Sequence, residues 1–227
     1  MPRVTAITEQ KKNAKRREAK KDKRFNIFLD GKYAFSIGEE HLLKIRLKED
    51  QNLTSAEIGA INKEESISKL LGKSINFLSY RPRSEKELKD YLIRSISKSE
   101  KIKWSEAKES TTPDSVVQKL KKYGYIDDEE FAKWWTDSRL RARPRGRKFI
   151  ELELKRKGIS QITIDKVLPN NSETDLKLAL QVLEKKRSKL EKLQPNELRR
   201  KVYYYLGSRG FDFDIIKEAF AIFTKRS

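Results

Sequence analysis

The sequence predicts a mainly α-helical protein of tandem three-helix repeats that form an elongated curved rod, preceded by a small N-terminal module with a β-hairpin. Apolar residues recur at helical spacing through most of the chain after residue 66. A stretch that begins at Gly158 resembles another that begins at Gly210, which indicates an internal repeat. Charged residues make up 38% of the chain and hydrophobic residues 36%, a balance that favours several modest cores over one compact core.

The N-terminal module, residues 1–63, carries the β-sheet signals. Apolar residues alternate through 25–37 on both sides of Asp30 and Gly31, the dipeptide typical of a type I′ hairpin turn. An isolated hairpin is marginal in water, so we expect 4–8 to add a third strand or a helix to cover the hairpin. The basic segment 11–24 is either a solvated loop or an arm that touches a polyanion.

Helices complete this module. A short helix is expected over 38–47, and Thr54 with Glu57 forms a capping box that begins another. His41, the single histidine, has no partner residues nearby in sequence. We therefore expect a surface or half-buried residue there, and no catalytic or metal-binding role.

Three repeats follow, at residues 64–126, 127–170 and 171–227. The second repeat has expected helices at 127–142, 145–157 and 160–168, and the third at 172–192, 195–208 and 212–224. The first repeat is more divergent, with a helix over 67–79 and two more that begin near Ser84 and Thr112. Its segment 95–111 is polar and fits no repeat helix, so we interpret it as an insertion that forms a surface loop with at most a short helix.

A basic corner lies in the second repeat. The helix before it begins at Asp127, whose carboxylate can cap free backbone N–H groups. Pro144 and Gly146 then break the helical pattern, and residues 139–148 contain six cations and no acid. A helix that faces a core needs no such cluster, so the corner is predicted to meet a negatively charged partner.

Two adjacent tryptophans precede the corner. Trp135 shares a helical face with Phe131, so we assign Trp135 to the core. Trp134 is expected to be more exposed, where it would cover a neighbouring repeat or stack on a base, with repeat packing favoured.

Charge and composition narrow the classes of function. The formal net charge is +19, which favours a polyanionic partner such as nucleic acid. There is no cysteine, no apolar leader and no run of roughly 18 apolar residues, so we expect a cytoplasmic protein without a membrane partner. The acids at 127–130 point in different directions on a helix and do not converge on a metal ion. No nucleotide-binding or protease motif is present, and we expect a protein that is not an enzyme.

Four segments carry a family resemblance. GYIDDEEFAKWW, SRLRARPRG, ELELKRKGI and, upstream, RPRSEKEL occur in order over most of the chain. Together they resemble the RecX family, regulators of the bacterial recombinase RecA. The resemblance implies binding in the helical groove of the RecA–single-stranded DNA filament, with inhibition of filament growth, ATP hydrolysis and strand exchange during DNA repair, recombination and the SOS response. It implies no cofactor. We expect a monomer whose partners are the RecA filament and single-stranded, or also double-stranded, DNA.

A second hypothesis is a sequence-nonspecific DNA-binding protein without a recombinase partner, because three-helix units resemble helix-turn-helix domains. Under either hypothesis the candidate contacts are cations. Arginine suits phosphate and carboxylate alike, so the residue types alone do not separate DNA from an acidic protein surface. The candidates are Arg81, Arg83, Lys121, Lys122, Arg139, Arg141, Arg143, Arg145, Arg147, Lys148, Lys155, Arg156, Arg199, Arg200 and Arg209.

Overall fold

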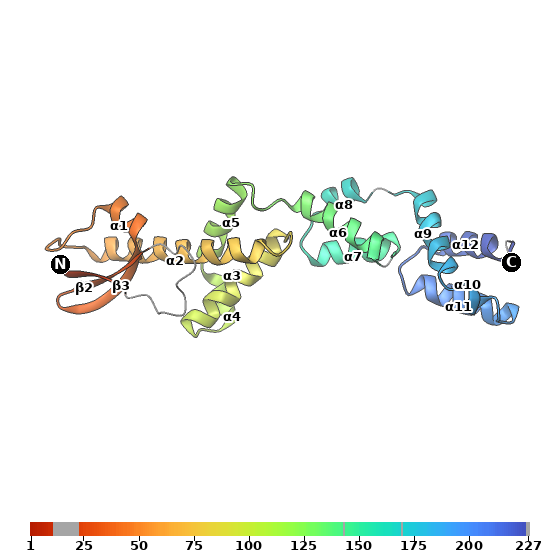
Figure 1. The fold of residues 1–227 in the computed structure, drawn as a ribbon, viewed down its shortest axis with the longest axis horizontal. Helices are drawn as coiled ribbons and strands as arrows, with labels where there is room; N and C mark the ends of the chain where they lie inside the picture. Colours follow the sequence, from red (N-terminus) through yellow and green to blue (C-terminus); the bar gives the residue numbers. More distant parts are fainter. Residues whose placement is uncertain (11–22, 143, 169, 226–227) are drawn as a thin grey trace.

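The protein is an elongated row of small units (Figure 1). A computed structural model describes residues 1–10, 23–142, 144–168 and 170–225. The N-terminal sheet lies at one end of the long axis, and the last helices lie at the other, so the two termini are far apart. The predicted fold class, tandem three-helix repeats after a small β-containing module, is confirmed.

The sheet has three antiparallel strands in the order β1-β2-β3. They are β1 (Val4–Glu9), β2 (Arg24–Leu29) and β3 (Lys32–Gly38). Asp30 and Gly31 both have positive φ, 47° and 77°, as a type I′ turn requires. The expected third strand is therefore confirmed. Most of the basic segment 11–24 lies outside the described residues.

Two helices follow the sheet, α1 (Glu39–Ile45) and α2 (Ser55–Leu78). The Thr54 and Glu57 capping box at the start of α2 is confirmed. The helix expected to begin at Thr54 and the helix expected over 67–79 are instead one continuous helix. The expected boundary between the N-terminal module and the first repeat, at 63/64, therefore lies inside α2. No proline interrupts this stretch. Its apolar face simply passes from the core of the N-terminal module to the core of the first repeat.

The first repeat is completed by α3 (Glu85–Glu100), α4 (Trp104–Glu109) and α5 (Thr112–Lys122). The surface loop expected over 95–111 is wrong, because α3 continues to Glu100. The short helix allowed for in this segment is confirmed as α4. Ile96 and Ala107 are 4% and 0% exposed and belong to the core of this repeat. Two apolar side chains are thus enough to anchor this polar segment to the core of the repeat.

The second repeat consists of α6 (Asp128–Ala142), α7 (Arg147–Arg156) and α8 (Gln161–Val167), close to the expected bounds. The third repeat consists of α9 (Ser172–Glu184), α10 (Arg187–Leu190), α11 (Pro195–Gly207) and α12 (Phe213–Lys225).

The single helix expected over 172–192 is wrong, since the chain turns at Lys185 and Lys186 before α10. The turn places Leu190 in the core and the ammonium of Lys186 4.4 Å from the Tyr205 ring centroid. Tertiary contacts therefore break a helix that local propensity would continue.

Each unit has its own apolar core. Four separate clusters are built around Ile27 in the N-terminal module, Leu88 in the first repeat, Phe131 in the second and Phe223 in the third. Because the cores do not merge, the contacts between repeats must come from other kinds of interaction.

Candidate functional site

The basic corner between α6 and α7 closes around an acid of its own repeat, Glu153. Arg139 Nε donates to Glu153 Oε2 at 2.6 Å, and Arg145 Nη1 donates to Oε1 at 2.6 Å. Trp135 Nε1 donates to the same carboxylate at 2.9 Å, and the guanidinium of Arg139 lies 4.2 Å from the Trp135 ring centroid. Part of the positive charge that marked the corner in the sequence is therefore compensated inside the molecule.

The remaining described cations of the corner contact different carboxylates. Arg147 Nη2 donates to Asp165 at 3.0 Å, and Lys148 forms an ion pair with Asp212 of the third repeat. Arg141 is 84% exposed, and its nearest carboxylate oxygen, on Asp137, is 3.8 Å away. Arg143 lies outside the described residues. Of the described corner cations, Arg141 projects most freely into solvent.

The first and second repeats meet at the N-terminus of α3. Ser84 caps α3 and donates its hydroxyl to the carbonyl of Lys157 at 2.8 Å, and Lys86 Nζ donates to the carbonyl of Arg156 at 3.0 Å. Gly158 follows with φ of 85°, and a Cβ there would lie 2.8 Å from Lys86 Cβ. The turn after α7 is thus held against the start of α3 by backbone carbonyls.

Glu87 connects this first junction electrostatically. Arg81 Nη1 and Nη2 donate to its two oxygens at 3.0 Å each, and Lys157 from the second repeat also pairs with it. Burial alone would raise the pKa of Glu87, but the hydrogen bonds from Arg81 and Lys157 outweigh it and lower the pKa to about 2. The carboxylate is therefore ionised at neutral pH and links the two repeats.

The second and third repeats meet in a similar way at the N-terminus of α7. The backbone N–H of Gly146, the N-cap of α7, donates to the carbonyl of Arg209 at 2.9 Å. Arg209 in turn donates to the carbonyl of Pro144 at 3.2 Å and to the Tyr205 hydroxyl at 2.9 Å. Gly210 has φ of 81°, and a Cβ there would lie 2.7 Å from the Phe149 ring. In both junctions the N-cap of one repeat's second helix meets the glycine turn of the next repeat.

Comparison with protein families matches four consecutive segments of this chain. They are described as the regulatory protein RecX N-terminal domain, at 2–54, and the first, second and third three-helix domains of RecX, at 71–95, 127–168 and 173–220. The regulatory protein RecX of Bacillus velezensis is 34% identical over 224 residues, covering 96% of this chain and 76% of that protein. The chain belongs to the RecX family.

Further members of the RecX family agree with this assignment. The regulatory proteins RecX of Bacillus subtilis and Listeria welshimeri are 34% and 32% identical over 222 residues each, covering 96% of this chain and 76% and 74% of their own lengths. A crystal structure of regulatory protein RecX has a TM-score of 0.67 at 24% identity, with 96% of this chain and 98% of that chain covered. A crystal structure of RecX from Lactobacillus salivarius has a TM-score of 0.60 at 23% identity, with 71% and 98% covered. These two structures support the fold.

The candidate cations of this RecX-family chain separate into two groups by their partners. The paired cations lie within 4 Å of a carboxylate oxygen. They are Arg81, Lys121, Arg139, Arg141, Arg145, Arg147, Lys148 and Lys155. The open cations have no carboxylate at that distance among the described residues. They are Arg83, Lys122, Arg156, Arg199, Arg200 and Arg209.

The open cations are not gathered in one cluster. They lie before α3, at the end of α5, at the end of α7, on α11 and after α11, so they follow the long axis of the molecule (Figure 1). Sequence reasoning did not separate the two groups, and it missed Glu87, Glu153 and Lys157. The partners of these three residues lie up to 70 residues away in the chain, so no local pattern marks them.

The acids at the start of α6 have separate structural roles. Asp127 accepts hydrogen bonds from the backbone N–H groups of Glu129 and Glu130 at 2.7 and 3.1 Å. Asp128 accepts from the backbone N–H of Glu85 at 2.8 Å, across the first junction, and its burial raises its pKa. No group of three His, Cys, Asp or Glu side chains in the described ranges is placed to hold a metal ion.

Trp134 and Trp135 lie at the first junction, between the first and second repeats. Trp134 and Trp135 are both half-buried and pack against the second repeat's core. The guanidinium of Arg81, from the first repeat, lies 5.7 Å from the Trp134 ring centroid. Lys157 lies 5.0 Å from the Trp135 ring centroid.

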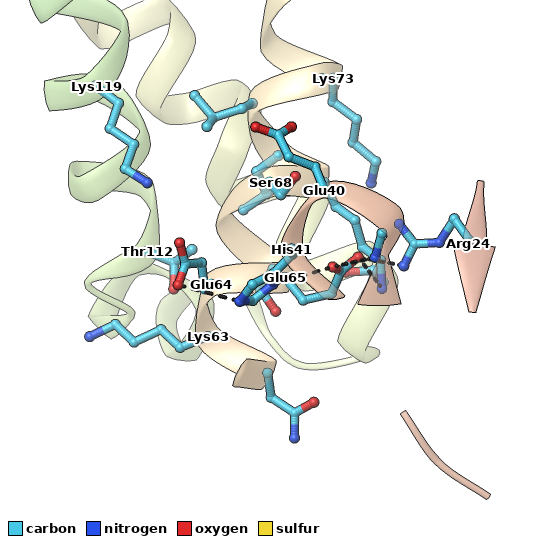
Figure 2. A pocket seen from close by; sticks show the side chains of 18 of the residues that line it. Arg24, Glu40, His41, Lys63, Glu64, Glu65, Ser68, Lys73, Thr112 and Lys119 are labelled. Atoms are coloured by element: carbon cyan, nitrogen blue, oxygen red, sulfur yellow. Dashed lines mark hydrogen bonds and ion pairs between the residues drawn. The ribbon is translucent and has the colours of Figure 1, made fainter. Parts of the chain in front are cut away.

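A cavity of about 930 Å³ lies between the N-terminal module and the first repeat. Figure 2 shows it between Arg24 of β2 and Lys119 of α5. His41 lies at its base, with Nε2 3.4 Å from Glu64 and Nδ1 4.0 Å from the buried Glu65, which also pairs with Arg24. The side chain of His41 is 11% exposed, so the single histidine helps to join α1 to α2.

Among the described residues, no helix combines the length and the apolar composition that crossing a membrane requires.

Proposed function

We propose that this RecX-family chain binds the RecA–single-stranded DNA filament in its helical groove and lowers filament growth and recombinase activity. The observation that carries the proposal is the row of three units, each with its own core, strung along one axis. An extended row of units offers a long binding surface and can contact successive subunits of a helical polymer. The proposed mechanism is occupancy of the filament.

Electrostatics supports a nucleoprotein partner. The net charge of +19 favours association with a polyanion. The open cations, except Arg209, which is hydrogen-bonded to Pro144 and Tyr205, can contact phosphates or acidic side chains without first breaking an internal ion pair. Among the paired cations, Arg139 and Arg145 are less available, because they would have to leave Glu153 unpaired. The proposed contacts to the filament are therefore centred on the open cations.

A titration of RecA ATPase activity over a series of salt concentrations tests the proposal. We expect inhibition at protein concentrations that leave bare single-stranded DNA largely unbound. A recombinase that hydrolyses ATP at full rate with this protein in excess would overturn it. The second hypothesis, DNA binding without a recombinase partner, instead predicts that any inhibition follows the occupancy of bare DNA and falls with salt in the same way.

A matched pair of variants tests which cations matter. Replacing Lys122, Arg156 and Arg200 together by Gln removes three open cations, and should weaken inhibition while the melting temperature stays unchanged. The control replaces Lys23, Lys32 and Lys48 by Gln, which removes the same charge from exposed positions of the N-terminal module. An equal loss of ATPase inhibition in both variants would show that net charge alone governs binding.

Because the proposed mechanism involves no bond cleavage, incubation of DNA with the protein and Mg²⁺ should return intact DNA. Gel electrophoresis of the product is the measurement, and shortened fragments would contradict occupancy as the mechanism.

A further inference from the structure

Two tyrosines beside the first junction are exposed without an apparent structural reason. Tyr80, after α2, is 81% exposed, and Tyr125, in the loop between α5 and α6, is 53% exposed. Both line one cavity of about 450 Å³, whose lining also includes the core residue Phe131 and the arginine Arg83. Exposed aromatic rings gathered around one hollow are typical of a binding surface.

Arg83 gives this cavity an unsatisfied positive charge. Its guanidinium lies 4.1 Å from the Phe77 ring centroid, its Nε is buried without a hydrogen-bond partner, and no carboxylate pairs with it among the described residues. Burial, followed by the repulsion of Arg81, lowers its pKa. A half-buried cation without a carboxylate partner favours an anionic ligand beside the guanidinium.

Among the described residues, the acids around the cavity do not form an ion pair with Arg83. Asp127 uses Oδ1 to cap α6, and Glu87 is engaged by Arg81 and Lys157. Glu130 also lines the cavity and is the remaining acid in its lining. The lining therefore combines two aromatic faces with a cation whose charge is not balanced by a bound acid.

We propose that this cavity binds one unstacked nucleotide of single-stranded nucleic acid. The base would stack on Tyr80 and Tyr125, and Arg83 would contact the adjacent phosphate. Aromatic stacking accepts any base because every base has a π-face, which suits a protein that binds without sequence preference. A carboxylate of an acidic protein would satisfy Arg83 but would leave both rings uncovered, so the aromatic pair favours nucleic acid. The proposal rests on the proposed function for its biological setting, but its binding step can be measured without a recombinase.

The test measures fluorescence anisotropy of a labelled oligothymidylate and of an abasic oligonucleotide of the same length. Tyr80→Ala and Tyr125→Ala should each weaken oligothymidylate binding about 5-fold or more, and should leave abasic binding unchanged. Tyr123→Ala is the matched control, since Tyr123 is 71% exposed, lies two residues from Tyr125 and does not line the cavity. An equal loss in the control, or an equal loss on the abasic strand, would overturn the stacking site.

Charge variants sharpen the assignment. Arg83→Gln should weaken binding to both strands and reduce its salt dependence, whereas Glu130→Gln should tighten binding to both. Circular dichroism melts of every variant establish that the fold is intact.

The ATPase assay separates this proposal from the proposed function. If tyrosine variants bind oligothymidylate like the parent protein but lose ATPase inhibition, the cavity binds protein and the nucleotide site is wrong. If the parent protein shows tyrosine-dependent binding without any ATPase inhibition, the nucleotide site stands and the proposed function is wrong.

Discussion

The two repeat junctions share one backbone arrangement but are held by different forces. At the first junction, the hydroxyl of Ser84 bridges to the carbonyl of Lys157, and Glu87 joins Arg81 and Lys157. At the second junction, Gly146 takes the place of the serine and brings its backbone N–H directly to the carbonyl of Arg209.

The difference has a physical consequence. At the first junction the serine side chain keeps the two backbones apart, and polar and ionic side-chain contacts hold the repeats together. The second junction has no side chain at its centre and depends on close backbone approach, since a Cβ on Gly146 would overlap the backbone of Gly210 and Phe211. The first junction should therefore respond mainly to charge, and the second mainly to side-chain volume.

The largest expected effect comes from Gly146→Ala. The added methyl group meets rigid backbone, so the second and third repeats must separate, at a cost at or above roughly 3 kcal/mol, the upper end of ordinary overpacking. Hydrogen exchange should rise at residues 144–149 and 209–212, while the separate cores of the two repeats stay protected. Unchanged exchange at these segments would contradict the proposed role of close approach.

The glycine turns allow a matched comparison of strain and contact. Gly124 and Gly158 have φ of 72° and 85°, but a Cβ on Gly124 meets nothing within 4 Å, whereas one on Gly158 meets Lys86. Gly124→Ala should cost about 1–2 kcal/mol from backbone strain alone, and Gly158→Ala should cost about 1 kcal/mol more because it also disturbs the first junction. Urea unfolding of both variants gives the difference, and equal costs would show that the contact at Gly158 is unimportant.

Glu87→Gln tests the charge at the first junction. Removing the carboxylate leaves Arg81 and Lys157 without their shared partner and should cost about 1–3 kcal/mol at neutral pH. The pKa of Glu87 in the folded protein is about 2, below its value in the unfolded chain. Its stabilising contribution is therefore complete above the unfolded-state pKa and is lost as the pH falls toward about 2.

Urea titrations of Glu87→Gln and the parent at several pH values check this dependence. The stability difference should shrink as the solution is acidified below the unfolded-state pKa. A difference that does not change with pH would mean that packing, and not charge, is lost in the variant.

The smallest expected effect is a gain in stability. Gly72 lies inside α2, and a Cβ there meets nothing within 4 Å, so Gly72→Ala should stabilise the protein by about 0.5–1 kcal/mol. This variant is also the control for Gly146→Ala, because it adds the same methyl group where there is room. Destabilisation by Gly72→Ala, measured by thermal unfolding, would argue against the continuous α2.

Local signals predicted those elements whose causes are local. The Asp30–Gly31 turn and the Thr54 capping box involve residues at most a few positions apart, and both are confirmed. The continuous α2 and the turn before α10 were missed, because both depend on which core each apolar residue joins. The burial of Ile96 and Ala107 was missed for the same reason.

For the candidate site, the sequence showed where the positive charge is, but not which part of it is available. Arg145 and Arg156 look alike in the sequence. In the folded protein, Arg145 pairs with Glu153, and Arg156 has no carboxylate partner among the described residues. The cavity at Tyr80 and Tyr125 likewise joins two loops that are distant in the chain.

By itself, the sequence determined the repeated helical architecture, the hairpin and the high positive charge, because periodicity, turn residues and net charge are local or additive properties. Only the tertiary structure decided which cations are paired, how the repeats are joined and where two exposed tyrosines share a cavity. Those features depend on contacts between residues far apart in the chain, and their geometry exists only after the separate cores have folded and docked.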